Sequence, residues 1–183
     1  MLYNDHSAYK QCIKMNDKIF KSKNIDYKLL TKPLITSGKR SISDDTDIDR
    51  IYYLQQNPSA WYLDADAIIN KWPDFEMQSG YPYISYSGAQ YDLWAIFGNN
   101  CSWFFDYLME AYYKANQKPI RFWAHYLINM ELKNKVKPVP EGYINHLHLS
   151  GAIASAEKTG RTIERAGYSI KIDYNDNWIL EVK

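Results

Sequence analysis

The stretch that decides the predicted fold is Trp61-Tyr62-Leu63-Asp64-Ala65-Asp66-Ala67-Ile68-Ile69. Bulky apolar residues lie on both sides of two acids that are separated by one residue, a pattern typical of a strand leaving a buried core. Residues two apart in a strand share one face, so we expect Asp64 and Asp66 to point the same way. Carboxylates this close repel each other unless a cation lies between them, and Mg²⁺ or Mn²⁺ takes such oxygen ligands. The sequence therefore predicts a metal–phosphate site at the end of this strand.

Length and composition limit the classes of protein to be considered. The chain has 183 residues and a net charge of +1, which allows one domain with a real core and gives no steering toward nucleic acid. No apolar run approaches the roughly 20 residues of a membrane span, and the first residues do not resemble a signal peptide. Two cysteines are too few for a disulfide framework, which fits a reducing compartment. We therefore expect a cytoplasmic protein with no transmembrane segment and no nucleic-acid partner.

Helix and strand signals alternate along roughly the first hundred residues, which favours an α/β layer with a partly parallel sheet. In such sheets ligands lie beyond the carboxyl ends of strands, where Asp64 and Asp66 are expected. The pair Lys39 and Arg40 lies in a long polar loop and is either a solvated pair or a phosphate clamp. The expected elements are, in order, a helix over 7–22 capped by Ser7 and broken at Asn24, a strand over 25–30, a loop over 32–45, a helix from Thr46 to Asn57-Pro58, and strands over 61–69, 81–87 and 92–98.

The second half of the chain reads as more helical. One apolar face at helical spacing predicts a helix over about 103–112, capped by Asn99 or Asn100, and a second predicts a helix over about 121–133. Residues 143–150 fit a strand or a loop. A helix around 152–166 and a hairpin of residues 169–174 and 178–182 end the sequence. We expect one compact domain over 1–183, of which 152–183 could form a C-terminal appendage.

The acids at 64 and 66 belong to a longer pattern. Upstream runs Thr46-Asp47-Ile48-Asp49-Arg50, followed by a helix and then Tyr62-Leu63-Asp64-Ala65-Asp66. This pattern resembles the DxD glycosyltransferases of the GT-A fold, in the family of fungal initiating mannosyltransferases and clostridial glucosylating toxins. The likeness covers about residues 44–70. It implies a nucleotide-diphospho-sugar transferase fold, which is α/β with a mixed sheet flanked by helices, here lacking the usual first strand and ending in a helix and hairpin.

The resemblance also implies a function and roles for single residues. The function is metal-dependent transfer of a sugar from a UDP- or GDP-sugar donor to an unknown acceptor, a glycan or a protein. Asp64 and Asp66 would bind Mn²⁺ or Mg²⁺, which stabilises the charge that grows on the leaving diphosphate. The nucleotide-sugar would contact Asp47, Arg50 and Tyr62. Arg50 suits this role because its planar fork of donors can bind sugar hydroxyls or phosphate.

A second match lies near the other end of the chain. The stretch Tyr143-Ile144-Asn145-His146-Leu147-His148-Leu149-Ser150-Gly151 is similar to the C-terminal metal motif of the glycogenin-like transferases. That likeness implies that His148 is a third metal ligand and that Gly151 approaches the diphosphate. In a strand His146 would share a face with His148, and the two could equally be a surface pair.

Plainer interpretations stay open for each of these residues. The acids at 64 and 66 could form a solvated turn, Asp47 could stabilise a helix start, and Arg50 could make an ordinary ion pair. The fold could be degenerate, binding sugar or a partner without catalysis. A metal-dependent phosphoryl-transfer enzyme or nuclease would need further acids, for which the sequence offers only Asp74, Glu76 and Asp92.

Overall fold

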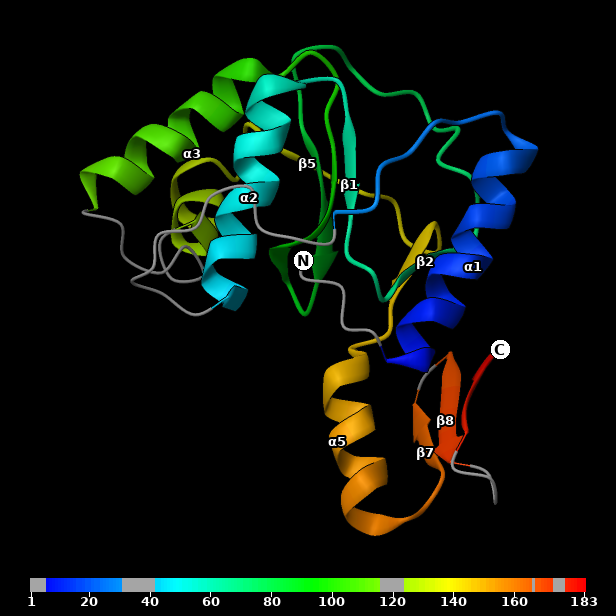
Figure 1. Cartoon of the computed structure of the whole chain (residues 1–183). Helices are drawn as coiled ribbons and strands as arrows, with labels where there is room; N and C mark the ends of the chain where they lie inside the picture. The colour runs from blue at the N-terminus through cyan, green and yellow to red at the C-terminus, as the bar shows by residue number, and fades with distance from the viewer. Residues whose placement is uncertain (1–5, 31–41, 116–123, 166, 173–176) are drawn as a thin grey trace. The chain divides into compact units, whose positions relative to one another are not determined.

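The structure, a computed structural model, describes residues 6–30, 42–115, 124–165, 167–172 and 177–183, with side chains described from residue 47 onward in the second range. The chain forms two compact units (Figure 1). The first unit contains the described parts of 30–64 and 73–141, and the second contains those of 3–29, 65–72 and 142–183. The expectation of one domain with an appendage at 152–183 stays a prediction.

A four-stranded sheet forms the centre of the first unit. Its strand order is β1-β4-β3-β5, with β3 and β5 parallel and the other neighbours antiparallel. The sheet is therefore mixed and the chain is an α/β protein, as the sequence predicts. The strands predicted over 81–87 and 92–98 are confirmed as β3 and β4. The strand bounds are β1 Trp61–Leu63, β3 Tyr83–Ser87, β4 Gln90–Phe97 and β5 Lys137–Pro138.

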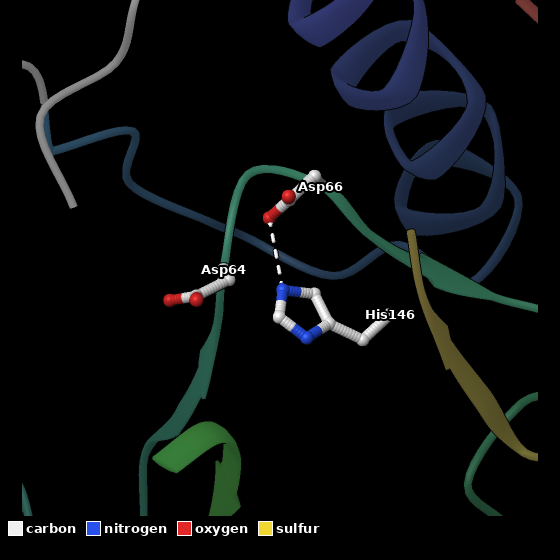
Figure 2. A group of neighbouring side chains, drawn as sticks. All are labelled: Asp64, Asp66 and His146. Carbon is white, nitrogen blue, oxygen red and sulfur yellow. Dashed lines mark ion pairs between the residues drawn. The ribbon is translucent and has the colours of Figure 1, made fainter. Parts of the chain in front are cut away.

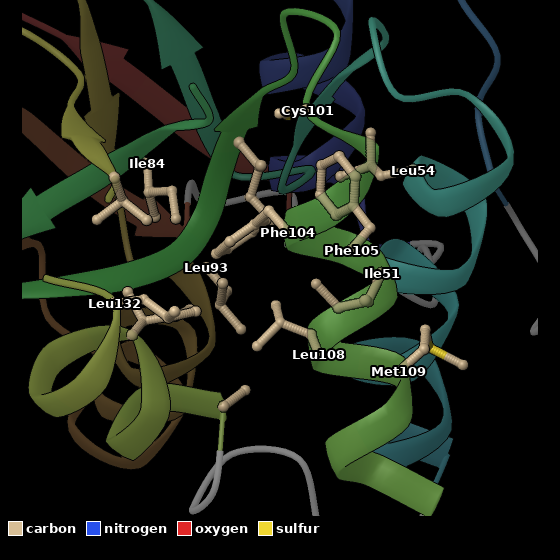
Figure 3. Packing of buried hydrophobic residues seen from close by; sticks show 14 of the residues in the cluster. Ile51, Leu54, Ile84, Leu93, Cys101, Phe104, Phe105, Leu108, Met109 and Leu132 are labelled. Atoms are coloured by element: carbon tan, nitrogen blue, oxygen red, sulfur yellow. The ribbon is translucent and has the colours of Figure 1, made fainter. Parts of the chain in front are cut away.

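Two helices, α2 (Ile42–Gln56) and α3 (Ser102–Lys114), pack beside each other and on this sheet. Their apolar faces bury large side chains against residues of β3 and β4, as Figure 3 shows. Burial of such side chains is worth about 1.5–3 kcal/mol each, so this cluster is the main stabilising feature of the unit. The largest buried members are Ile48, Ile51, Leu54, Ile84, Ile96, Phe104, Phe105, Leu108 and Ile128.

The helix ends differ from the prediction although the helices themselves are confirmed. The second helix begins at Ile42, four residues before Thr46, so Thr46 lies inside the helix and does not cap it. Cys101 precedes α3, and Asn99 instead donates its amide to the Met77 carbonyl at 2.7 Å. Caps are weak local signals that tertiary hydrogen bonds override. Within the described residues, no helix is long and apolar enough to cross a membrane.

Two other predictions for this unit reach beyond the described residues. The pair Lys39 and Arg40 lies outside them, as does most of the loop expected over 32–45, of which 42–45 is helical. The helix expected over 121–133 is described from residue 124 and contains a π-helical turn, η1 (Leu127–Glu131). That turn closes with a hydrogen bond from the Leu132 amide to the Leu127 carbonyl at 2.8 Å.

The second unit combines α1 and α5 with two small antiparallel sheets, β2-β6 and β7-β8-β9. The predicted hairpin at the end of the sequence is confirmed by the pairing of β8 with β9. The helix expected over 152–166 runs from Leu149 to Thr159 and ends at Gly160, whose φ of 60° closes it. The bounds are α1 Ser7–Ser22, β2 Ala67–Ile69, β6 Ile144–His146, α5 Leu149–Thr159, β7 Ile163–Arg165, β8 Tyr168–Ile172 and β9 Trp178–Val182.

Two amide side chains of α1 take the place of neighbouring strands. Asn16 donates to the Ala67 carbonyl at 2.7 Å and accepts from the Ile69 amide at 3.0 Å. Gln11 makes the same double contact with β9, to the carbonyl of residue 178 and the amide of residue 180. A side-chain amide offers one acceptor and two donors, so it can satisfy a strand edge as another strand would. These contacts fix β2 and β9 against α1.

Two predicted strands are wrong. The stretch 61–69 forms two strands, β1 in the first unit and β2 in the second, with Asp64, Ala65 and Asp66 between them. Residues 25–30 join no strand ladder among the described residues, and the side chains of Ile25, Tyr27 and Leu29 are exposed. Apolar alternation alone does not supply a partner strand, which a β-strand needs for its backbone hydrogen bonds.

The first helix begins at a histidine cap instead of the expected Ser7. The His6 Nδ1 accepts a hydrogen bond from the Ala8 amide at 3.2 Å, which only the neutral ring can do. Burial lowers the pKa of His6 and outweighs the charge of Glu157, which raises it. The ring also contacts Trp178 edge-on, with centroids 4.6 Å apart.

We expect His6 to make the stability of the chain depend on pH. Its folded pKa lies below the unfolded value of about 6.5, so the cap contributes fully above that pH and is lost as the pH falls toward the folded pKa. Asn accepts the same cap hydrogen bond and does not titrate, so His6→Asn should lose less free energy of unfolding between about pH 7 and pH 5. Urea unfolding of both proteins at each pH measures this, and parallel curves would contradict it.

Candidate functional site

The two acids that the sequence singles out lie in the connection between β1 and β2. Both are buried, Asp64 at 8 % and Asp66 at 4 % exposure. Since the connection is a turn, the expectation that they share one face of a strand is wrong. Each carboxylate is held by residues of its own unit, Asp64 by the first and Asp66 by the second.

Asp64 is held by a buried tyrosine and a buried arginine. The Tyr62 hydroxyl donates to its Oδ1 at 2.7 Å, and Arg50 Nη1 lies 3.4 Å from the same oxygen. The Asp64 amide donates to the Trp94 carbonyl at 2.8 Å, which extends the β1–β4 ladder by one residue. Burial raises the pKa of Tyr62 well above its usual value, so this hydroxyl keeps its proton and remains a donor.

Arg50 has further partners in the first unit. Its Nη2 lies 2.7 Å from Asp47 Oδ1, its Nη1 donates to the Leu93 carbonyl at 2.8 Å, and its guanidinium lies over the Tyr62 ring at 4.8 Å. The arginine is only 6 % exposed. Asp47 and Arg50 therefore form the expected contact, and their role in sugar binding stays a prediction.

The charge of Arg50 is secured by its surroundings. Burial by itself lowers the pKa of Arg50, but the nearby acids, Asp64 first and then Asp47 and Asp92, raise it above its ordinary value. A buried ion pair is expensive to desolvate, and further hydrogen bonds help to offset this cost. The Leu93 carbonyl provides one for Nη1, whereas Nε is buried without a hydrogen-bond partner among the described residues. The guanidinium thus holds Asp64 in one position at the end of β1.

Asp66 is held by a different set of contacts, all within the second unit. Its Oδ1 lies 3.3 Å from His146 Nε2 (Figure 2). Its Oδ2 accepts a hydrogen bond from the Leu149 amide at the start of α5 at 3.0 Å. Burial raises the pKa of Asp66, but His146 and the Leu149 amide outweigh this and hold the pKa below its usual value. Pairing of Ala67 with His146 between β2 and β6 brings the imidazole to this carboxylate.

The two residues that the sequence matched to the glycogenin-like motif lie next to this pair. His148 precedes α5 in a left-handed conformation with φ of 50°, its side chain is exposed, and its ring lies 4.0 Å from that of His146. Gly151 lies in the first turn of α5, where an added Cβ would meet nothing within 4 Å. His146 contacts Asp66, and the role of His148 as a ligand stays a prediction.

Three side chains around the β1–β2 connection offer ligand atoms that suit a metal cation. Asp64, Asp66 and His146 each offer one ligand atom, two carboxylate oxygens and one imidazole nitrogen. In the described part of the chain they are the only group of three such side chains. The further acids that a two-metal enzyme would need, Asp74 and Glu76, are exposed and belong to no such group among the described residues.

Comparisons with known proteins give no family for this chain. No protein-family model matches it, and neither a curated protein nor a solved structure was found to be similar.

We expect Arg50 to be essential for the stability of the first unit. Arg50→Met leaves the buried Asp64 and the partly buried Asp47 without their cation, so the free energy of unfolding should fall by about 3–5 kcal/mol. Arg50→Lys keeps the charge but loses the planar fork, so it should lie between the wild type and Arg50→Met.

The exposed pair Lys114 and Glu110 provides the control for this experiment. Their ion pair is 2.6 Å long but lies at the surface, so Lys114→Met should change the free energy of unfolding by less than about 0.5 kcal/mol. Urea unfolding measures all three variants. A loss in Arg50→Met no larger than in Lys114→Met would contradict the structural role of Arg50.

Proposed function

We propose that the chain is a metal-dependent glycosyltransferase that moves a sugar from a nucleotide-diphosphate donor to a glycan or protein acceptor. The observation that carries the proposal is the buried Asp66 carboxylate, which is fixed by His146 and by the start of α5. One residue, Ala65, separates it along the chain from Asp64, a second buried carboxylate that is fixed independently. Such preorganised oxygen donors are what a hard divalent cation requires.

In this proposal Asp64, Asp66 and His146 hold the cation. A single residue separates the two acids, so the chain itself keeps their backbones close however the two units are arranged. An imidazole among the donors favours Mn²⁺ over Mg²⁺, because Mg²⁺ is bound almost entirely through oxygen atoms and water. When bound, the cation stabilises negative charge on the departing diphosphate.

Other residues of the predicted site would recognise the rest of the nucleotide-sugar. The open space at Gly151, in the first turn of α5, allows a diphosphate to approach backbone amides at the positive end of that helix. Asp47, Arg50 and Tyr62 would contact the sugar or the nucleotide. Arg50 would act by orienting Asp47 and Asp64 as much as by direct contact, because it already bonds both acids.

The same contacts of Arg50 favour a second candidate function. The guanidinium is buried and bonds Asp47, Asp64 and the Leu93 carbonyl, so a sugar would have to compete with the protein for its donors. A degenerate transferase that binds a nucleotide-sugar or a partner without catalysis fits this arrangement. Release of UDP from UDP-sugars in the presence of Mn²⁺ separates the two functions, since only the enzyme produces it.

We expect UDP to bind only in the presence of Mn²⁺, because the cation joins the carboxylates to the phosphates. Calorimetry with Mn²⁺ should show binding that EDTA abolishes. Asp66→Asn should weaken it by at least about 100-fold, since it removes a direct ligand, and losses of about 10–100-fold are typical even for residues that only support a ligand.

Asp26→Asn is the matched control, because Asp26 is an exposed acid of the same unit. It should bind UDP and Mn²⁺ as the wild type does. Equal affinities in Asp66→Asn and Asp26→Asn, or UDP binding that persists in EDTA, would contradict the proposed metal site.

A further inference from the structure

The ladder between β3 and β4 is interrupted by a shift in register. Ile84 pairs with Ile96, but the next pair is Tyr86 with Tyr91, so the register shifts between them. The Ser85 hydroxyl bridges the gap, donating to the Asp92 carbonyl at 2.5 Å and accepting from the Ala95 amide at 3.2 Å. Such bulges re-aim side chains, and they are frequent next to active sites.

The side chain at the break is an acid paired with a histidine. Asp92 Oδ1 lies 3.4 Å from His125 Nε2, and it also accepts from the Leu93 amide at 2.7 Å. The two side chains are partly exposed, Asp92 at 35 % and His125 at 30 %. A carboxylate on one ring nitrogen orients the imidazole and leaves the other nitrogen, Nδ1, to exchange a proton with a ligand.

A third amide side chain holds the two elements together beside this pair. Asn129, in η1, accepts from the Tyr91 amide at 2.7 Å and donates to the Tyr91 carbonyl at 3.1 Å. It also donates to the His125 carbonyl at 2.9 Å. The backbones that carry Asp92 and His125 are therefore fixed to each other, and π-helical turns of this kind are frequent at functional sites.

The pair lies close to the arginine that holds Asp64. The Leu93 carbonyl, next in the chain to Asp92, accepts from Arg50, and the charge of Asp92 contributes to raising the pKa of Arg50. All of these residues belong to the first unit. An acid–base pair therefore lies beside the residues that would contact the donor sugar.

We infer that His125 is the general base of the proposed transfer and that Asp92 positions it, an inference that rests on the proposed function. The acceptor hydroxyl oxygen forms a bond to C1 of the sugar while the bond from C1 to the phosphate oxygen breaks. The bonding electron pair leaves with the nucleoside diphosphate. The hydroxyl proton passes to His125 Nδ1 and from there to solvent, so charge and atoms balance.

The test uses water as the acceptor, so no acceptor need be known. Hydrolysis of UDP-glucose, UDP-galactose, UDP-N-acetylglucosamine and GDP-mannose is measured with Mn²⁺ for the wild type, His125→Ala and Asp92→Asn. We expect His125→Ala to be slower by about 10²–10⁴-fold, the usual contribution of a general base. Added imidazole should restore part of the rate, because the side chain it replaces is partly exposed.

The pH dependence separates a base from a merely structural residue. The wild-type rate should rise with pH, because a general base acts only in its unprotonated form, and His125→Ala should lack this rise. Asp92→Asn should lower the rate, because the imidazole then loses the carboxylate that orients it. Met130→Ala is the control, since Met130 lies in the same helical segment with 68 % of its surface exposed, and its rate should be unchanged.

Three results would overturn the inference. If His125→Ala keeps the wild-type rate and pH profile, or if its lost rate is not restored by imidazole, His125 is not the base although the enzyme is a transferase. If the wild type binds Mn²⁺ and UDP but hydrolyses none of the donors, catalysis itself fails and the inference fails with it.

Discussion

A buried arginine is the constraint on which the first unit depends. Removing a guanidinium from water costs free energy, which acids and carbonyls must offset in place of the water. Arg50 is bound by Asp47, Asp64 and the Leu93 carbonyl. Meeting that requirement fixes the direction of Asp64 at the end of β1. It also fixes the Leu93 carbonyl of β4, which accepts a hydrogen bond from Arg50 Nη1. The position of Asp64 thus follows from the need to keep the guanidinium of Arg50 buried.

The second unit fixes its acid by a different device. Asn16 of α1 binds both backbone groups of β2, and β2 in turn pairs with β6, so His146 is brought opposite the residue after Asp66. The start of α5 then donates its Leu149 amide to the same carboxylate. A short connection therefore carries two acids that are oriented separately, which is the preparation that a cation site needs.

Much of the secondary structure could be predicted from local patterns. The helix over 7–22, the strands near 83–97, the apolar helix from residue 102 and the final hairpin all have a regular period of apolar residues, and each is present. The strand over 61–69 was wrong because apolar residues on both sides of the acids do not reveal that the two halves enter different sheets. The predicted cap of the first helix, Ser7, was also wrong. The cap is His6, and histidine is too rare at this position to be recognised from the sequence.

The candidate site was predictable only in part. The pair Asp47 and Arg50 could be predicted from spacing, since residues three apart on a helix can meet. Asp64 and Asp66 stand out as two acids inside an apolar stretch. The choice between His146 and His148 depends on the pairing of β2 with β6, which joins residues far apart in the sequence. His125 and Asp92 carry no motif at all, and only the break in β4 and the contacts of Asn129 bring them together. Non-local pairing is the information that a single sequence lacks.

The central claim is that a cation bound here takes a nitrogen ligand from His146. Pulsed electron paramagnetic resonance of the Mn²⁺-loaded protein detects such a nitrogen directly through its coupling to the metal electron spin. We predict that the coupling is present in the wild type and in His148→Ala and absent in His146→Ala. Mn²⁺ that binds without nitrogen coupling, or coupling that disappears only in His148→Ala, would contradict this account.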